Sequence, residues 1–321
     1  MLTKMDGILF GKLYWSFFLD HSRRGAGSML PLRGDVMKIG FIGAGKVGFT
    51  LGKYFSLHGA EVVGYYSRSF ESAEKAARFT GTTAYQNRSE LIEACDMLFL
   101  TVPDGMIASL YQEIAGEVQG KYICHSSGAL TAAAAFPGIE KTGAFGYSVH
   151  PLFAVSDAYH AYEELADVFF ALEGSAEHLA DIQEYLKGTG LKVQVIPSEA
   201  KTQYHCAASI VSNLVVALAY QGMTMLEECG FTPEGARQAL TPLMRGNMCH
   251  ILEDGPVAAL TGPVERADAG TVTKHLGCLK REGERELYRL VSQKLVEVAE
   301  KKHPERDYTS VKEILNTRMN G

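Results

Sequence analysis

A Gly-x-Gly-x-x-Gly turn near the start of the chain joins an apolar stretch to a helical pattern. The apolar run 39–42 leads into Gly43, Gly45 and Gly48, and apolar residues then recur at helical spacing. Gly43 permits a tight turn, Gly45 lets the backbone approach a pyrophosphate, and Gly48 lets the helix pack on the strand. The N-terminus of such a helix offers free N–H groups to phosphates. The feature therefore predicts a parallel α/β sheet that binds a dinucleotide through Gly43, Ala44, Gly45, Lys46, Val47 and Gly48.

The residues at the end of the second predicted strand, 61–66, indicate which dinucleotide binds. Proteins that bind NAD place an Asp or Glu there, on the ribose hydroxyls. This chain has Ser67, Arg68 and Ser69 instead. A guanidinium suits a 2′-phosphate, because it forms charge-assisted and bidentate hydrogen bonds. We therefore predict NADPH as the cofactor, with these three residues as ligands; the alternative is that Arg68 is an ordinary exposed loop residue.

Two later strands bring further residues to the same edge of the sheet. The continuous apolar run 96–102 predicts a buried parallel strand. Its end, Val102 and Pro103, lies at the carboxyl edge, where ligands bind in open α/β sheets. The strand 122–124 delivers Ser127 to that edge, where its hydroxyl either faces the cofactor or caps the next helix. We predict that Val102, Pro103 and Ser127 contact the cofactor.

The pattern changes after residue 196. Strands and helices alternate over 37–196, whereas 197–321 is helical throughout. The fold class is therefore α/β: an N-terminal Rossmann dinucleotide-binding domain followed by an all-α C-terminal substrate domain. The long helix expected over 198–229 is apolar all round, which predicts that it is buried. Residues 1–36 do not fit the fold, so we expect a leader produced by a mis-assigned start, with Met37 as the true start, or a disordered tail.

Composition excludes several classes of protein. The 321 residues carry a formal net charge of -6 and form no basic stripe, so no nucleic-acid partner is expected. We find no stretch long and apolar enough to span a bilayer, and expect no membrane partner. The six cysteines form no CxxC pair, which argues against a zinc site or a disulfide framework. A cytoplasmic location in reducing conditions fits best.

Polar residues interrupt the apolar surface of the long helix. Lys201 and His205 lie four residues apart, Ser209 follows on nearly the same face, and Asn213 lies at its margin. Reduction of a ketone by hydride needs a proton donor at the developing alkoxide, which Lys201 can supply or stabilise. His205 would orient the substrate or relay a proton, and Ser209 and Asn213 would bind it. The alternative is a satisfied core histidine and a lysine that reaches solvent.

Three more residues are candidates for binding the substrate. His150 follows a strand of the first domain and precedes Pro151, so it is expected at the ligand edge. Arg266 lies in a loop that contains Gly and Pro, where a fixed cation could bind a carboxylate. Asp268 either holds Arg266 or only caps the following helix. The histidines match no ligand spacing, so no metal site is predicted.

These motifs resemble Rossmann-like proteins that carry a DUF2520 C-terminal domain. The resemblance spans residue 37 to about 302. It implies similarity to the pyrroline-5-carboxylate reductases, ketopantoate reductases and β-hydroxyacid dehydrogenases. Members of that group pair a Rossmann domain with a helical domain like that of 6-phosphogluconate dehydrogenase, and they commonly form homodimers through the helices. The motifs that carry the resemblance are residues 38–48, Ser67-Arg68-Ser69, Val102-Pro103-Asp104, Ser126-Ser127-Gly128, His150-Pro151-Leu152, Lys201 with His205, Ser212-Asn213, and residues 260–263 with Arg266 and Asp268.

The resemblance implies an NADPH-dependent oxidoreductase acting on CH–OH groups. The lead substrate is a small 2-oxo carboxylate, 2-dehydropantoate (ketopantoate), in pantothenate synthesis. The alternatives are an imine reductase of the pyrroline-5-carboxylate type and, from another class, a non-catalytic NADP(H)-binding sensor. Two residues depart from the pattern. In the hydroxyacid and ketopantoate enzymes Asn follows the catalytic Lys by four residues, where this chain has His205, and Ala267 stands where we expect Gly.

Overall fold

The computed structural model describes residues 37–317, and the expectation for residues 1–36 lies outside that range. The chain divides into two compact units, one that ends at His205 and one that begins at Cys206. The change of sequence pattern predicts a boundary after residue 196, where the strands end. The units divide later, within a helix, because the first residues of that helix pack into the first unit.

The first unit is built on an eight-stranded sheet with the strand order β3-β2-β1-β4-β5-β6-β7-β8. Neighbouring strands from β3 to β6 are parallel, β7 is antiparallel to β6, and β8 is parallel to β7. This is the Rossmann-like sheet that the glycine turn predicts. The strands are β1 (Lys38–Ile42), β2 (Glu61–Tyr66), β3 (Thr83–Ala84), β4 (Met97–Leu100), β5 (Tyr122–His125), β6 (Phe145–Pro151), β7 (Phe169–Gly174) and β8 (Lys192–Val195).

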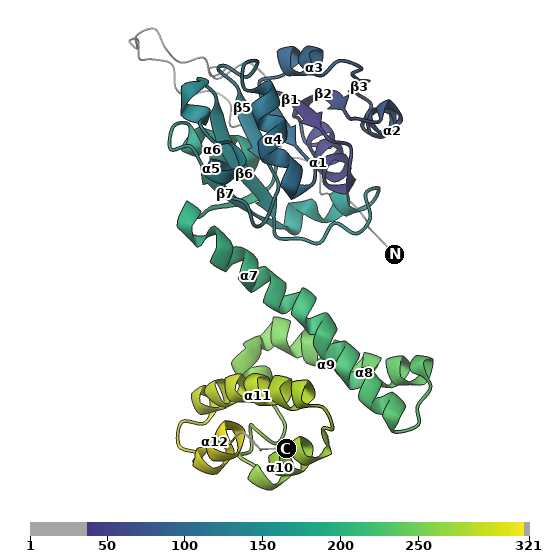
Figure 1. Cartoon of the computed structure of the whole chain (residues 1–321), viewed down its shortest axis with the longest axis vertical. Coiled ribbons are helices and arrows are strands. Elements are labelled where there is room, and N and C mark those ends of the chain that lie inside the picture. Colours follow the sequence, from purple (N-terminus) through teal and green to yellow (C-terminus); the bar gives the residue numbers. More distant parts are fainter. Residues whose placement is uncertain (1–36, 318–321) are drawn as a thin grey trace, which may run out of the picture. The chain divides into compact units, whose positions relative to one another are not determined.

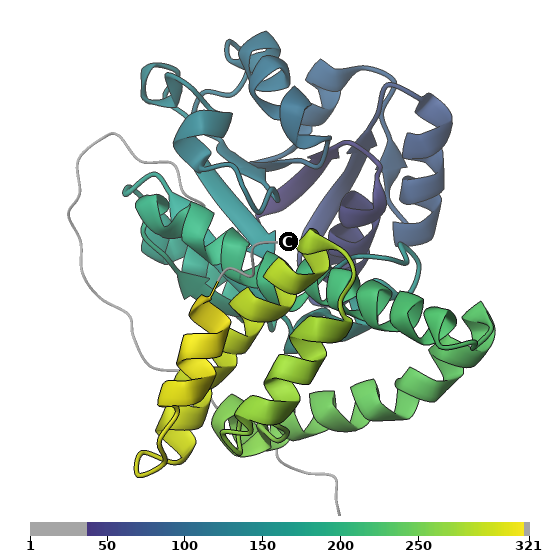
Figure 2. The same cartoon turned by 60° about the horizontal axis from the view of Figure 1, so that its bottom comes forward.

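Helices cover both faces of the sheet (Figures 1 and 2). Alternate residues of a strand point to opposite faces. In β4, Met97 and Phe99 therefore join the core under α1, α2 and α6, while Leu98 and Leu100 join the core under α3, α4 and α5. Burial on both faces explains why this strand is a continuous apolar run. The helices are α1 (Lys46–Leu57), α2 (Phe70–Thr80), α3 (Arg88–Ala94), α4 (Asp104–Ile114), α5 (Ala132–Ala135) and α6 (Leu179–Gly188).

The second unit is helical, as predicted. In Figure 1, α9 lies beside α8, and α10, α11 and α12 gather around a small apolar core. The expected long helix is interrupted at Ser212, whose φ of -112° and ψ of -77° separate α7 from α8. A second interruption occurs at Gly255, with φ of +81°, inside α9. The helices are α7 (Lys201–Val211), which spans the boundary, α8 (Asn213–Glu228), α9 (Pro233–Ala259), α10 (Ala269–Cys278), α11 (Glu282–Lys302) and α12 (Thr309–Asn316).

The prediction that the long apolar helix is buried is wrong for this chain by itself. No residue of α8 is buried, although the helix contacts α9. One chain supplies too few helices to surround α8, so its apolar residues remain exposed. The stretch Ser198–Glu228, which contains an 18-residue window with a mean hydropathy of 1.4, also meets a length and composition criterion for crossing a membrane, contrary to our expectation that none would. By itself such a stretch is weak evidence, because core helices meet the same criterion.

Candidate functional site

The three glycines of the turn meet different surroundings. Gly43 has φ of +107°, and a Cβ atom there would lie 2.4 Å from the carbonyl oxygen of Thr101. A Cβ at Gly48 would lie 2.6 Å from the carbonyl oxygen of Gly43. A Cβ at Gly45 would come no closer than 3.9 Å to Thr101. The fold therefore requires Gly43 and Gly48, whereas Gly45 leaves open the space in which a ligand would approach the backbone.

A cavity of about 350 Å³ opens beside this turn. It brings together seven of the predicted cofactor residues: Gly43, Ala44, Gly45, Ser67, Arg68, Val102 and Pro103. The remaining five, Lys46, Val47, Gly48, Ser69 and Ser127, do not line it. The cavity also includes residues that the sequence analysis missed, namely Ile42, Tyr66, Ser72, Arg88, Thr101, Met106, Leu110 and Glu113. No local motif marks the residues of α3 and α4 among these, because they reach the cavity only through tertiary packing.

Two of the predicted serine ligands use their hydroxyls to stabilise local structure. Ser69 caps α2, with its Oγ accepting a hydrogen bond from the N–H of Ser72 at 3.4 Å. Ser127 Oγ donates to Asp104 Oδ2 at 2.6 Å and accepts from two backbone N–H groups of the following turn. The neighbouring Ser126 has a buried Oγ without a hydrogen-bond partner among the described residues. Ser126 is thus the better placed of these hydroxyls to bind a ligand.

Lys201 is fully buried at the start of α7. Its Nζ donates a hydrogen bond to Oγ of Ser148, a buried residue of β6. Burial lowers the pKa of Lys201 from 10.5 to about 8, and the nearby charges of Glu173 and Asp104 oppose that shift. An ammonium group with this pKa releases its proton far more readily than an exposed lysine does. Lys201 therefore has the protonation behaviour expected of a general acid near neutral pH.

Glu173 is a buried carboxylate that the sequence analysis did not consider. It lies directly opposite Ser148 across the antiparallel pairing of β6 and β7. Its Oε1 accepts from the N–H of Ala132 at 2.8 Å, and its Oε2 accepts from the hydroxyl of Ser198 at 2.6 Å. The only sequence signal is a charged residue at the end of an apolar strand. Glu173 provides a fixed negative charge near Lys201.

Two histidines converge on Gly128. Nδ1 of His150 lies 3.0 Å from the hydroxyl of Tyr204, and the rings of His150 and His205 are 6.1 Å apart. A Cβ atom at Gly128 would lie 2.5 Å from Nδ1 of His205 and 2.8 Å from Nε2 of His150. Nδ1 of His205 is buried and has no hydrogen-bond partner among residues 37–317. Because Gly128 has no side chain, the imidazoles of His150 and His205 can both occupy the space beside its Cα atom.

Burial and neighbouring charge keep two histidines of this cluster neutral. Burial, with the charges of Lys201 and His205, lowers the pKa of His150 to about 4. Burial also lowers the pKa of His125 to about 3, with contributions from Lys201 and His150. Nδ1 of His125 accepts the N–H of Ser127 at 3.1 Å, which a neutral ring can do. Lys201 therefore lies beside the neutral imidazoles of His125 and His150.

The first unit brings Lys201, His205 and His150 near one another. The other predicted substrate residues belong to the second unit. Ser209 is half-buried on α7, and Asn213 is exposed, with its Oδ1 accepting from the hydroxyl of Ser212 at 3.1 Å. That these residues, together with Arg266 and Asp268, share a site with Lys201 stays a prediction.

The loop that carries Arg266 is held by its neighbours. Ala267 adopts φ of +57°, which explains why Gly is the expected residue there. Asp268 caps α10 by accepting the N–H of Thr271 at 2.9 Å, so it serves the capping role considered for it. The preceding Glu265 accepts from Nε2 of His303 at 2.6 Å. Arg266 itself is exposed and makes no side-chain hydrogen bond within the described part of the chain, which leaves its guanidinium free to bind an anion.

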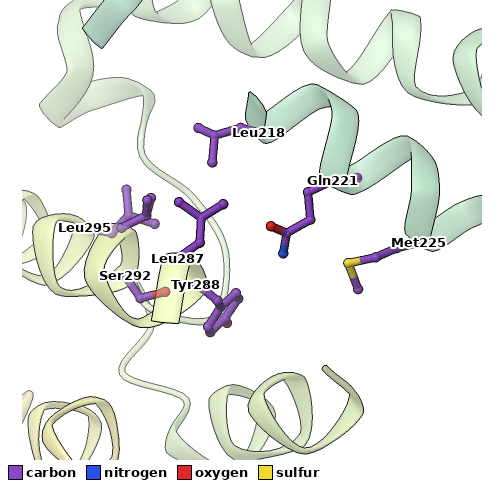
Figure 3. Close-up of a pocket in the computed structure, with 9 residues that line it drawn as sticks. Leu218, Gln221, Met225, Leu287, Tyr288, Ser292 and Leu295 are labelled. Atoms are coloured by element: carbon purple, nitrogen blue, oxygen red, sulfur yellow. The ribbon is translucent and has the colours of Figure 1, made fainter. Parts of the chain in front are cut away.

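A second cavity, of about 250 Å³, lies inside the helical unit between α8 and α11. Figure 3 shows Gln221 from α8 and Leu287 and Tyr288 from α11 at this space. The hydroxyl of Tyr288 is bound to Nδ1 of His275 at 2.8 Å. The lining contains no carboxylate, amine or guanidinium group. Within residues 37–317, no group of three or more potential ligands could hold a metal ion.

The sheet order, the glycine turn and the cavity beside it define a protein with a Rossmann dinucleotide-binding fold. Family models match two parts of the chain: a Rossmann-like domain over residues 24–151, and a domain of unknown function, DUF2520, over residues 168–295. These two matches agree with the resemblance that the sequence motifs carry. A search of curated proteins finds no match.

Several solved structures share this fold over most of the chain. Protein TM1727 from Thermotoga maritima is 29% identical, with a TM-score of 0.65 over 82% of this chain and 99% of its own. A putative NADP oxidoreductase, BF3122 from Bacteroides fragilis, is 21% identical, with a TM-score of 0.61 over 82% and 98%. Pyrroline carboxylate reductase from Plasmodium falciparum, solved with NADP bound, is 13% identical, with a TM-score of 0.53 over 84% and 97%. These likenesses confirm the predicted two-part fold.

Proposed function

We propose that the protein is an NADPH-dependent reductase of a small 2-oxo carboxylate. The observation that carries the proposal is the fully buried Lys201, hydrogen-bonded to Ser148 and grouped with His150 and His205. A protein that only bound a dinucleotide would have no need of a buried lysine, which costs free energy of folding. Perturbed ionisable groups gathered in one place are typical of functional sites.

The cavity beside the glycine turn fits the adenosine half of NADPH. The open space at Gly45 admits a pyrophosphate, and the N-terminus of α1 offers it free N–H groups. Arg68 and Ser67 would bind a 2′-phosphate, while Val102 and Pro103 supply an apolar wall for the base. Structures that share the fold include a putative NADP oxidoreductase and a pyrroline carboxylate reductase solved with NADP bound, which supports the same choice of cofactor.

When bound, NADPH would supply the hydride, and the chain's own residues would manage the proton. Lys201 would donate a proton from Nζ to the oxygen that becomes a hydroxyl, or stabilise the charge on that oxygen. Ser148 holds Nζ in place, and Glu173 favours its protonated form. His205, with its unpartnered Nδ1, would orient the substrate, assisted by His150. Substrate binding would involve Arg266 at the carboxylate and Ser209 and Asn213 at the remaining polar groups.

The lead substrate is ketopantoate. Its carboxylate suits the guanidinium of Arg266, and its adjacent ketone suits a proton donor such as Lys201. The second candidate is a cyclic imine carboxylate, and the shared fold of pyrroline carboxylate reductase favours it. A protonated imine needs less help from a lysine. The two candidates therefore predict different consequences of removing Lys201.

The test is NADPH oxidation, followed at 340 nm, with ketopantoate, other 2-oxo acids and pyrroline-5-carboxylate. Turnover of ketopantoate that is abolished in Lys201→Ala would support the main proposal. Turnover of pyrroline-5-carboxylate that survives Lys201→Ala would favour the imine reductase. Binding of NADPH without turnover of any compound would instead favour a cofactor-binding sensor and overturn the assignment as a reductase.

We also propose that the protein is a homodimer through its helical unit. Large apolar side chains lie exposed along α7, α8 and α9, and a second copy with the same face would bury them. Light scattering of the full chain should give the mass of two copies, and Leu214→Lys should reduce it to one. A monomeric wild-type protein would overturn this proposal. The exposed residues are Ile210, Val211, Leu214, Val216, Leu218, Tyr220, Leu243, Met244, Met248 and Leu252.

A further inference from the structure

Two arginines from separate segments line the cavity beside the glycine turn. Arg68 follows β2, as expected from the sequence, and Arg88 is the first residue of α3. Nη1 of Arg88 lies 2.7 Å from Oε2 of Glu113, a residue of α4 that also lines the cavity. The Arg88 side chain is 25% exposed and that of Glu113 is 61% exposed. The cavity therefore contains a second guanidinium, and it is paired with a carboxylate at the edge of the cavity.

We propose that Arg88 is a second ligand of the 2′-phosphate of NADPH, and that Glu113 holds Arg88 when no cofactor is bound. The inference rests on the proposed binding of NADPH in this cavity. It adds a residue that no motif marks, because Arg88 is brought to Arg68 only by the packing of α3 beside β2.

An exchange of partners at Arg88 is physically favourable. The Glu113 side of the ion pair is largely exposed, and ion pairs that solvent reaches contribute little stability. A phosphate monoester carries roughly two negative charges near neutral pH and presents several acceptor oxygens. Arginine binds such a group through two parallel hydrogen bonds, which are stronger than bonds between neutral groups. The phosphate should therefore displace Glu113 from Arg88.

Glu113 would make this exchange selective. The 2′-hydroxyl of NADH is uncharged and cannot compete with a carboxylate for a guanidinium, so the ion pair would stay intact. The Glu113 carboxylate competes with the 2′-phosphate for Arg88 and also repels that phosphate. Removing the carboxylate should strengthen binding of a 2′-phosphate, whereas removing the guanidinium should weaken it. A pair that only tied α3 to α4 would show no such opposite effects.

The experiment measures binding of adenosine 2′,5′-bisphosphate and of 5′-AMP to the full chain by calorimetry. These probes share the adenosine 5′-phosphate and differ in the 2′-phosphate. We expect Arg88→Gln to weaken binding of the bisphosphate by about tenfold or more, as for loss of a charged hydrogen bond. Binding of 5′-AMP should change by less than about twofold. Glu113→Gln should strengthen binding of the bisphosphate severalfold, and Arg88→Lys should restore part of the lost affinity.

Other outcomes overturn the inference. No change in Arg88→Gln, equal losses for both probes, or weaker binding of the bisphosphate in Glu113→Gln would each contradict a role for Arg88 at the 2′-phosphate. Thermal unfolding of each variant excludes misfolding, and Arg68→Gln gives the loss expected of a phosphate ligand. If the wild-type protein binds neither NADPH nor NADH, the proposed function itself fails. If it binds NADPH and Arg88→Gln binds it equally well, only this inference fails.

Discussion

The ammonium group of Lys201 donates a hydrogen bond to the hydroxyl of Ser148, and both side chains are inaccessible to solvent. A lysine in such a place loses its hydration, and a single hydroxyl does not replace it. The fold tolerates this cost because Glu173 lies across the sheet from Ser148 and supplies an opposing charge. The pair therefore holds a readily released proton beside the middle of β6.

Replacing Lys201 should remove turnover without removing the cofactor. We expect Lys201→Ala to lower kcat by at least about 100-fold, because general acid catalysis contributes that much. The Kd for NADPH should change by less than about twofold, since Lys201 does not line the cofactor cavity. For the wild type, kcat should fall as the pH rises through about 8, because the protonated form of Lys201 is the active one. Steady-state kinetics and fluorescence titration test both expectations, and unchanged turnover would remove Lys201 from the mechanism.

The neutral histidines should make the first unit sensitive to acid. Their folded-state pKa values, about 4 for His150 and about 3 for His125, lie below the ordinary 6.5. As the pH falls below 6.5, the unfolded chain takes up protons that the folded chain cannot, so stability is lost. Each histidine should cost roughly 2 kcal/mol between pH 6.5 and 5. Urea unfolding at the two pH values measures this loss, which should shrink in His125→Phe; an equal loss in that variant would contradict the assignment.

A methyl group at Gly128 should disturb the cluster of imidazoles. Gly128→Ala places a Cβ within 3 Å of both His150 and His205, so the rings must move apart. We expect a loss of about 1–3 kcal/mol in the free energy of unfolding and a marked fall in kcat. Gly105→Ala is the matched control, because a Cβ there meets nothing within 4 Å. Equal effects of the two substitutions on kcat would show that Gly128 has no special place in the site.

The glycines of the turn should separate stability from cofactor binding. Gly48→Ala forces a Cβ to 2.6 Å from a carbonyl oxygen and should destabilise the fold by about 1–3 kcal/mol. Gly45→Ala meets no protein atom closer than 3.9 Å, so stability should hardly change, while NADPH should bind much more weakly. Thermal unfolding and cofactor titration of both variants make the comparison. Tight binding of NADPH to Gly45→Ala would contradict the placement of the pyrophosphate.

Ala267→Gly should stabilise the helical unit. Alanine at φ of +57° carries a conformational cost of roughly 1–2 kcal/mol, which glycine does not pay. The greater entropy of glycine in the unfolded chain offsets part of that gain, so we expect about 1 kcal/mol at most. Chemical denaturation measures the difference. A destabilised variant would show that the methyl group of Ala267 makes contacts that outweigh the backbone strain.

Much of the fold and part of the site could be predicted from local pattern. The strands, the helical second half and the proximity of Lys201 to His205 follow from periodicity and spacing, which depend on neighbours in the sequence. The pairing of Arg88 with Glu113 and the approach of Glu173 to Lys201 could not be predicted, because each joins segments that only the sheet and its helices bring together. The prediction that α8 is buried is wrong. An apolar surface indicates that a helix needs a partner, but it does not indicate whether the same chain supplies that partner.

The sequence by itself determined the glycine turn of a Rossmann dinucleotide-binding fold, because Gly43, Gly45 and Gly48 act through backbone geometry within one short turn. It also determined the pair Lys201 and His205, which one helical repeat aligns. Only the tertiary structure decided that Ser127 is hydrogen-bonded while Ser126 has no partner among the described residues, and that the charge of Glu173 lies near Lys201. It also decided that Gly128 makes room for two imidazoles. Those features depend on the crossing of strands and helices far apart in the chain, where burial and hydrogen bonding are settled together.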